Sequence, residues 1–166
     1  MTVLEKKIDT CLRWIVAEEQ HERDKIATEA ISLLQQNMET TNAFAVEDCV
    51  VDLLRELGTS QGILGFNYLV SAIMLVMENN EYLNYITGKL YPDVADRFGT
   101  KPNRVERAVR HAIEKAFDNG DPEAHIKLFG GGISRFSGKA TNSEFIAACA
   151  REVQRRMRNR GQTWND

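Results

Sequence analysis

Arginines recur along one side of a helix that the sequence predicts from about Asn103 to Asp118. Arg104, Arg107 and Arg110 follow one another at intervals of three residues, and His111 comes directly after the last of them. At about 100° per residue these side chains share one half of the helix with two glutamates, while the other half is apolar. An arginine can donate two parallel hydrogen bonds to O6 and N7 of guanine, and a recognition helix meets base edges with its N-terminal half. The pattern indicates a helix that reads double-stranded DNA; a merely solvated charged face is the alternative.

The segment leading into this helix has the features of a helix–turn–helix. In residues 91–110, YPDVADRFGTKPNRVERAVR, Ala95 supplies a small side chain where two helices would cross. Gly99 follows four residues later, where a tight turn favours positive φ. The apolar residues expected to fill the angle between the helices are Val94, Phe98, Val105 and Ala108.

Charge is distributed unevenly along the 166 residues, whose formal net charge is −3. Residues 1–60 contain 6 Lys and Arg against 12 Asp and Glu, whereas residues 97–160 contain 14 against 7. A concentrated positive field favours phosphate binding, because neutralised phosphates release counterions. The run from Arg151 to Arg160 could by itself be a solvated helix end, but that reading does not cover the segment from Arg97 to Arg110.

The N-terminal stretch from Thr2 to about Met38 contains neither glycine nor proline and is predicted to be helical. Apolar residues recur at helical spacing on both sides of a polar segment, Glu18 to Lys25; they are Leu4, Ile8, Cys11 and Ile15, then Ile26, Ala30 and Leu33. The stretch is therefore either two helices or one long helix with an exposed middle. Its narrow stripe favours coiled-coil or hairpin packing, and docking on its own domain is an equal alternative.

The remaining elements are also predicted to be helices. Residues 42–45 are expected to be a linker. The helix that follows the linker should end at Gly58. The expected helices run from 46 to 57, from Gly62 or Gly65 to Glu78, from 81 to 91, from about 122 to 129 and from 141 to 159. Pro92 would occupy the first turn of the next helix or kink a continuous one. Residues 119–122, NGDP, predict a turn, residues 130–132, GGG, a flexible loop, and Thr141 with Glu144 a capping box.

No strand-like alternation and no internal repeat is visible, so the expected fold is all-α. We divide the chain into an N-terminal helical segment at residues 1–41, which could be a dimerisation element, a helix–turn–helix domain at 42–160 and a tail at 161–166. The most apolar run, Ile63 to Met77, is short for a membrane span, and the charged N-terminus does not resemble a signal peptide. We expect a cytoplasmic protein without a membrane partner.

No cofactor, metal ion or catalytic activity is expected. Cys11, Cys49 and Cys149 are too far apart for a disulfide or zinc framework and are predicted to be small core or half-buried residues. The three histidines do not pair with cysteines or acids at metal-ligand spacing, and no nucleophile–base set can be argued from the sequence. The glycine run lacks the spacing of a nucleotide-binding loop.

Two long blocks of this sequence resemble a known family. RVERAVRHAIE at 104–114 and TNSEFIA at 141–147 are similar to the C-terminal effector domain of the sporulation transcription factor, stage zero sporulation protein A. The similarity extends over about residues 46–158 and includes LFG at 128–130. It implies a six-helix domain whose fourth helix enters the major groove at a TGTCGAA-like box.

The resemblance also implies roles for particular residues. Glu106, Arg107 and Arg110 match positions that contact bases, and Phe129 lies in a region implicated in contacting an RNA polymerase sigma factor. Such proteins bind DNA as tandem dimers, so a homodimer is expected. From their places around the recognition helix, we expect DNA-backbone or supporting contacts from Lys101, Asn103, Arg104 and His111.

The N-terminus departs from the family, which carries an α/β phosphoacceptor receiver domain before the effector domain. About 45 residues precede the effector domain here, and they show no strand pattern. Phosphorylation control by that route is therefore not predicted. The leading hypothesis is a sequence-specific transcription regulator; the alternative is a receiver-less interaction protein that modulates a full-length regulator or a sigma factor.

Overall fold

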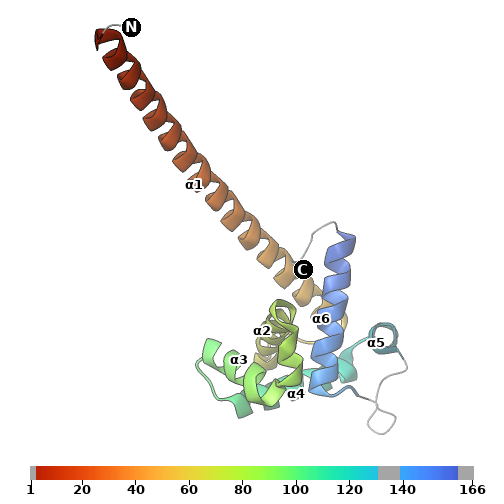
Figure 1. The fold of residues 1–166 in the computed structure, drawn as a ribbon. Helices are drawn as coiled ribbons and strands as arrows, with labels where there is room; N and C mark the ends of the chain where they lie inside the picture. Colours follow the sequence, from red (N-terminus) through yellow and green to blue (C-terminus); the bar gives the residue numbers. More distant parts are fainter. Residues whose placement is uncertain (1–2, 131–138, 161–166) are drawn as a thin grey trace. The chain divides into compact units, whose positions relative to one another are not determined.

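The computed structural model describes residues 3–130 and 139–160, and all regular secondary structure in these ranges is helical (Figure 1). The α-helices are α1 (Val3–Glu56), α2 (Leu64–Glu78), α3 (Tyr91–Arg97), α4 (Pro102–Asn119), α5 (Pro122–Phe129) and α6 (Asn142–Asn159). A 3-10 helix, η1 (Asn80–Asn84), and a π-helix, η2 (Ile86–Leu90), connect α2 to α3. The all-α fold class is confirmed.

The chain divides into two compact units, Met1–Thr41 and Asn42–Asp166, which we call the N-terminal unit and the C-terminal unit. The described part of the N-terminal unit is one uninterrupted stretch of α1, so of the two arrangements predicted the single long helix is found. The large apolar side chains that the structure describes in this unit are exposed, as in Leu12 at 56% and Leu34 at 63%. Cys11 is exposed as well, so the prediction that all three cysteines are at least half-buried was wrong for this one.

The predicted linker at residues 42–45 is helical. Nothing there forces a break, because the segment has no glycine or proline and ordinary residues cost a helix at most about 0.7 kcal/mol each. The hydroxyls of Thr40 and Thr41 also donate hydrogen bonds of 2.8 Å to carbonyls four residues earlier, which satisfies them within the helix. The helix ends at Glu56, and Gly58 follows with φ +84°, as the sequence predicts.

The core of the C-terminal unit surrounds α2, which packs against both α4 and α6. Most of its faces are buried, as its almost continuous apolar sequence predicts. The last turns of α1 belong to this core through Val46, Cys49, Val50, Leu53 and Leu54. At Gly65 the backbones of α2 and α4 come so close that a Cβ atom would lie 2.1 Å from the carbonyl oxygen of Ala108.

The helix predicted over residues 81–91 is replaced by η1 and η2. Asn79 caps η1 by accepting a hydrogen bond of 2.9 Å from the backbone N–H of Glu81. The N–H groups of Lys89 and Leu90 both donate to the carbonyl of Tyr85, which widens the turn into a π-helix. The widened turn places Leu90 and Tyr91 in the core, and Pro92 lies in the first turn of α3, one of the two predicted places.

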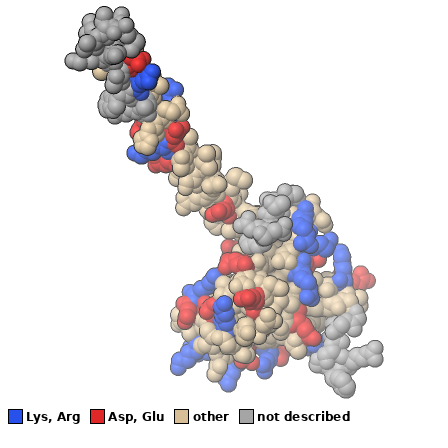
Figure 2. Space-filling model, in the orientation of Figure 1, with Lys and Arg blue, Asp and Glu red and all other residues tan. Residues whose placement is uncertain are grey.

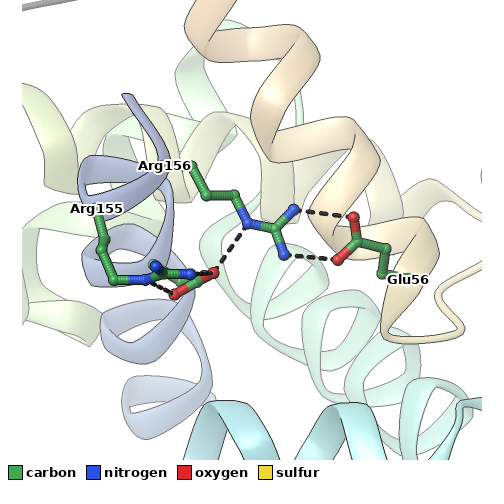
Figure 3. Close-up of polar contacts among 4 residues, drawn as sticks. Glu56, Arg155 and Arg156 are labelled. Carbon is green, nitrogen blue, oxygen red and sulfur yellow. Dashed lines mark hydrogen bonds and ion pairs between the residues drawn. The ribbon is translucent and has the colours of Figure 1, made fainter. Parts of the chain in front are cut away.

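An ion-pair network joins α6 to the end of α1 within the C-terminal unit (Figure 3). The Arg156 guanidinium donates to both carboxylate oxygens of Glu56, at 2.9 and 2.6 Å, and to Glu152 at 2.9 Å. Arg155 donates twice to Glu152, at 2.8 and 2.7 Å. These hydrogen bonds, those from Arg155 above all, lower the pKa of Glu152 to about 2. Two arginines of the basic run at the end of α6 are thus engaged within the protein.

A second contact lies beside this network, just after the end of α1, where Gly58, Gly120 and His125 meet. The His125 Nε2 atom lies 3.1 Å from the carbonyl oxygen of Leu57 and 3.2 Å from that of Ala116, so it donates to both. A Cβ atom on Gly120 would lie 2.3 Å from the Leu57 carbonyl oxygen, and one on Gly58 would lie 2.4 Å from the Gly120 Cα atom. This glycine–histidine contact fixes the C-terminal end of α4 against the end of α1.

The predicted capping box at the start of α6 is confirmed. The Thr141 hydroxyl accepts from the Glu144 backbone N–H at 3.3 Å, and the Glu144 carboxylate accepts from the Thr141 N–H at 2.8 Å. Of the predicted glycine loop, Gly130 is described and has φ +58°, whereas 131 and 132 lie outside the described residues. The predicted tail at 161–166 also lies outside them. None of the described helices is long and apolar enough to cross a membrane.

Candidate nucleic-acid interface

The turn between α3 and α4 has the geometry that the sequence predicts for a helix–turn–helix. Gly99 has φ +59° and its N–H donates to the Asp96 carbonyl, while the Thr100 N–H donates to the Ala95 carbonyl at 2.9 Å. These two bonds form a Schellman motif, which ends a helix with a left-handed residue. Ala95 is fully buried at the crossing of the two helices. A Cβ on residue 99 would meet no other atom within 4 Å, so the glycine is needed for its φ angle.

The apolar residues predicted between the two helices divide into two groups. Val94 and Val105 are fully buried and Ala108 is half-buried. Phe98 is 43% exposed, so its prediction as a filler of the angle was wrong. Its ring instead contacts Tyr68 of α2 edge-on, with 4.9 Å between centroids, because α3 ends at Arg97 and the chain has already turned outward.

Helix α4 has one buried and one exposed face, as predicted for a recognition helix. The buried residues are Val105, Val109, Ala112, Ile113 and Ala116. The exposed face carries Arg104, Arg107, Arg110 and His111. Figure 2 shows Lys and Arg side chains along the edge of the C-terminal unit where Figure 1 places α3 and α4, with acidic side chains between them.

The three residues predicted to contact bases lie on adjacent turns of this face. Arg110 Nη2 and Glu106 Oε1 are 2.7 Å apart, and both groups remain accessible, with side-chain exposures of 60% and 34%. Arg107, which follows Glu106 in the sequence, is exposed as well. A carboxylate accepts from the amino group of cytosine, and a guanidinium donates to guanine. The pair thus presents an acceptor and donors together at one place on the helix surface.

The residues predicted to contact the DNA backbone surround the start of α4. Lys101, Asn103 and Arg104 are all exposed, and Pro102 stands in the first turn. No side chain caps the N-terminus of α4. Uncapped backbone N–H groups at a helix N-terminus carry a partial positive charge that suits phosphate oxygens. His111 lies one turn beyond Arg107 and is exposed too.

Phe129, the candidate for a sigma-factor contact, is half-buried at the end of α5 rather than free on the surface. Its ring lies 5.6 Å from that of Phe145 and 5.7 Å from that of Phe117, and it is stacked on His125 at 6.1 Å. The ring is thus part of an aromatic cluster that also supports the end of α4.

Two residues that position α4 were not predicted from the sequence. His125 is buried, and its acceptors at Leu57 and Ala116 are 68 and 9 residues away. Gly65 lets α2 approach α4, whereas its place in the sequence predicts only a helix start. Neither residue has a local sequence signal for its role, since both depend on contacts between distant segments.

Two of the three cysteine thiols are buried in the C-terminal unit. Burial raises the pKa of the Cys49 and Cys149 thiols, which makes both poor nucleophiles. Within residues 3–130 and 139–160, no group of His, Cys, Asp and Glu side chains is arranged to hold a metal ion.

Comparison with known protein families places this geometry in context. Residues 50–153 match the family described as "Sporulation initiation factor Spo0A C terminal". The matched range includes α2 to α5, the whole helix–turn–helix and the capping box of α6.

Proposed function

The chain belongs to the Spo0A C-terminal family of DNA-binding regulatory domains, and on this premise we propose that it reads a TGTCGAA-like box through the major groove with α4. The observation that carries the proposal is the exposed face of α4, where Glu106 and Arg110 form an ion pair beside Arg107. Such a regulator works in the cytoplasm, on the chromosome.

We assign base reading to Glu106, Arg107 and Arg110. Each arginine would donate to O6 and N7 of a guanine, and Glu106 would accept from the amino group of a cytosine. The ion pair between Glu106 and Arg110 holds the guanidinium in place before DNA arrives, which lowers the entropy lost on binding.

We assign orientation on the duplex to Lys101, Asn103, Arg104 and His111. All four are exposed on the first three turns of α4 or directly before it. Contacts to phosphates fix the register of a protein on DNA and provide affinity without sequence preference.

Two partners belong to this proposal besides DNA. A second copy of the chain would provide a homodimer, and an RNA polymerase sigma factor would bind near Phe129. An interaction protein that modulates a full-length regulator or a sigma factor is the competing function. Binding of a sigma factor or regulator without any DNA binding would favour it.

The test is a DNA-binding titration of the full chain at fixed salt with a duplex that contains the box and one in which the box is scrambled. Arg107→Ala and Arg110→Ala are expected to weaken binding to the box by about 1–3 kcal/mol each and to reduce discrimination between the duplexes. Lys101→Ala should weaken binding to both duplexes alike. Arg158→Ala, which removes an exposed arginine from α6, is the matched control and should leave discrimination unchanged. Wild-type binding by both α4 variants would refute the assigned roles.

A further inference from the structure

The N-terminal unit carries an apolar stripe that no residue of the described chain covers. Along α1, the positions 8, 12, 16, 19, 23, 26, 30 and 34 all fall within an arc of about 80° at about 100° per residue. Six of the eight are apolar, and the larger ones are at least half exposed: Ile8 52%, Leu12 56%, Val16 63%, Ile26 57% and Leu34 63%. Helices in water derive most of their stability from packing an apolar face, so an exposed stripe of this length indicates an interaction surface.

The stripe is symmetric about one residue. Its positions are spaced by 4, 4, 3, 4, 3, 4 and 4 residues, so they read the same from either end and are centred on His21. The two members of each symmetric pair match in kind. Apolar residues pair with apolar residues, and the central pair consists of opposite charges: Ile8 with Leu34, Leu12 with Ala30, Val16 with Ile26, and Glu19 with Arg23.

A two-fold dimer requires this kind of symmetry. When one surface patch contacts itself across a two-fold axis, residue i meets residue j of the partner and j meets i. We infer that the N-terminal unit pairs with the same unit of a second copy as an antiparallel two-helix coil centred on His21. Every position of the stripe then meets a complementary side chain, with each Glu19 facing an Arg23 of the other copy.

Charge decides between the two orientations. In a parallel, in-register pair, Glu19 would face Glu19 and Arg23 would face Arg23, so both charged layers would repel. In the antiparallel pair both layers attract. The apolar positions recur after 18 residues, as in 8 and 26, 12 and 30, and 16 and 34, which is about five α-helical turns and suits nearly straight helices.

A membrane surface fits this stripe less well than a second copy. Residues 1–41 contain 8 Asp and Glu against 5 Lys and Arg, whereas helices that lie on anionic membranes carry mostly Lys and Arg on their polar face.

Antiparallel pairing also sets a distance between the two ends of the coil. The two Thr41 residues would lie on opposite sides of the two-fold axis, about 60 Å apart at about 1.5 Å per residue. The residues at which the two C-terminal units begin would thus lie at opposite ends of the coil.

Disulfide cross-linking tests the orientation in the full chain. In a Cys11→Ser background, Leu12→Cys and Ala30→Cys are prepared as separate variants; Cys49 and Cys149 are buried and stay. The antiparallel coil predicts that mild oxidation of a mixture of the two variants yields a covalent dimer, whereas each variant alone does not. His21→Cys, on the side of α1 opposite to the stripe, is the control and should not cross-link in any case. Self-cross-linking of Leu12→Cys alone, or sedimentation of the full chain as a monomer, would overturn the inference.

Charge exchange provides a second, independent measurement. Glu19→Arg and Arg23→Glu each place like charges in two layers of the dimer and should raise its Kd roughly tenfold, as measured by analytical ultracentrifugation. The double variant restores opposite charges and should return the Kd towards that of the wild type. Glu39→Arg makes the same charge change on the opposite side of α1 and should have little effect. No recovery in the double variant would contradict the antiparallel register.

This inference rests on the homodimer proposed above but not on the assigned DNA contacts. Cross-linking and sedimentation are carried out without DNA, and the substitutions lie in the N-terminal unit. Failure of the antiparallel coil would therefore leave the roles of Arg107 and Arg110 untouched. Conversely, a covalent mixed dimer that does not bind the box would refute the DNA assignment and keep the coil.

Discussion

The N-terminal unit and the helices of the C-terminal unit have the same secondary structure but differ in what covers their apolar side chains. Leu34 in α1 is 63% exposed, whereas Leu69 in α2 is fully buried between α4 and α6. The comparison teaches that an apolar stripe predicts a helix equally well in both places. Whether the stripe is covered within the chain or by a second molecule depends on the rest of the fold.

Matched leucine deletions test this difference most strongly. Leu69→Ala is expected to lower the unfolding free energy of the C-terminal unit by about 3 kcal/mol, because it leaves a cavity in a closed core. Leu34→Ala should change that free energy by less than about 0.5 kcal/mol, because the side chain is exposed in the monomer. Urea unfolding followed by circular dichroism in dilute solution measures both. An equal loss of unfolding free energy in the two variants would show that the Leu34 side chain is buried in the monomer.

A pair of glycine substitutions tests how closely the helices of the C-terminal unit are packed. A Cβ atom at residue 65 would lie 2.1 Å from the Ala108 carbonyl oxygen, so Gly65→Ala should force α2 and α4 apart and cost about 2 kcal/mol. Gly88→Ala is the control, since a Cβ there would meet nothing within 4 Å, and its effect should stay within about 0.5 kcal/mol. Thermal unfolding compares them, and a normal midpoint for Gly65→Ala would mean that the helices can separate without loss.

Ion pairs of the two units provide the smallest and most specific test. The pKa of Glu152 is lowered from 4.5 to about 2, chiefly by the hydrogen bonds from Arg155. The resulting stabilisation is present above pH 4.5 and is lost as the pH falls towards 2. The free energy of unfolding of the wild type should exceed that of Glu152→Gln by about 1 kcal/mol at neutral pH, after allowance for solvent screening. That advantage should disappear in acid.

The exposed pair of Asp9 and Arg13 in the N-terminal unit is the counterpart. Its oxygen–nitrogen distance is 3.1 Å, but both side chains are more than half exposed. Asp9→Asn should therefore change the free energy of unfolding of this helix by no more than about 0.5 kcal/mol. A larger loss than for Glu152→Gln would reverse the expected ranking of the two units.

The sequence was most informative where a local rule determines the structure. Helix α4 spans Pro102–Asn119 against a prediction of 103–118, because apolar and charged residues alternate at a strict helical period. Gly99 adopts positive φ, and Thr141 with Glu144 forms a capping box, since both signals depend only on neighbouring residues.

The errors were of two kinds: a break was predicted where no local signal ends the helix, and a local pattern was followed where distant contacts determine the structure. Residues 42–45 look like a linker, yet helix continues through them into a buried segment that begins at Val46. Phe98 follows an apolar pattern but lies outside the angle between the helices. The support of α4 by His125 could not be predicted, because its hydrogen-bond acceptors are backbone carbonyls, which carry no residue identity.

The contact of Gly58 with Gly120 has a consequence for genetics. Neither glycine belongs to the arginine face of α4, yet a side chain at either position would collide with backbone atoms that hold the end of that helix. A screen for loss of regulation would therefore recover substitutions at these two codons alongside those at Arg107 and Arg110, the proposed base-contacting residues. Shifting the culture temperature would separate the two classes, because alleles that loosen the fold regain activity in the cold and alleles that remove a DNA contact do not.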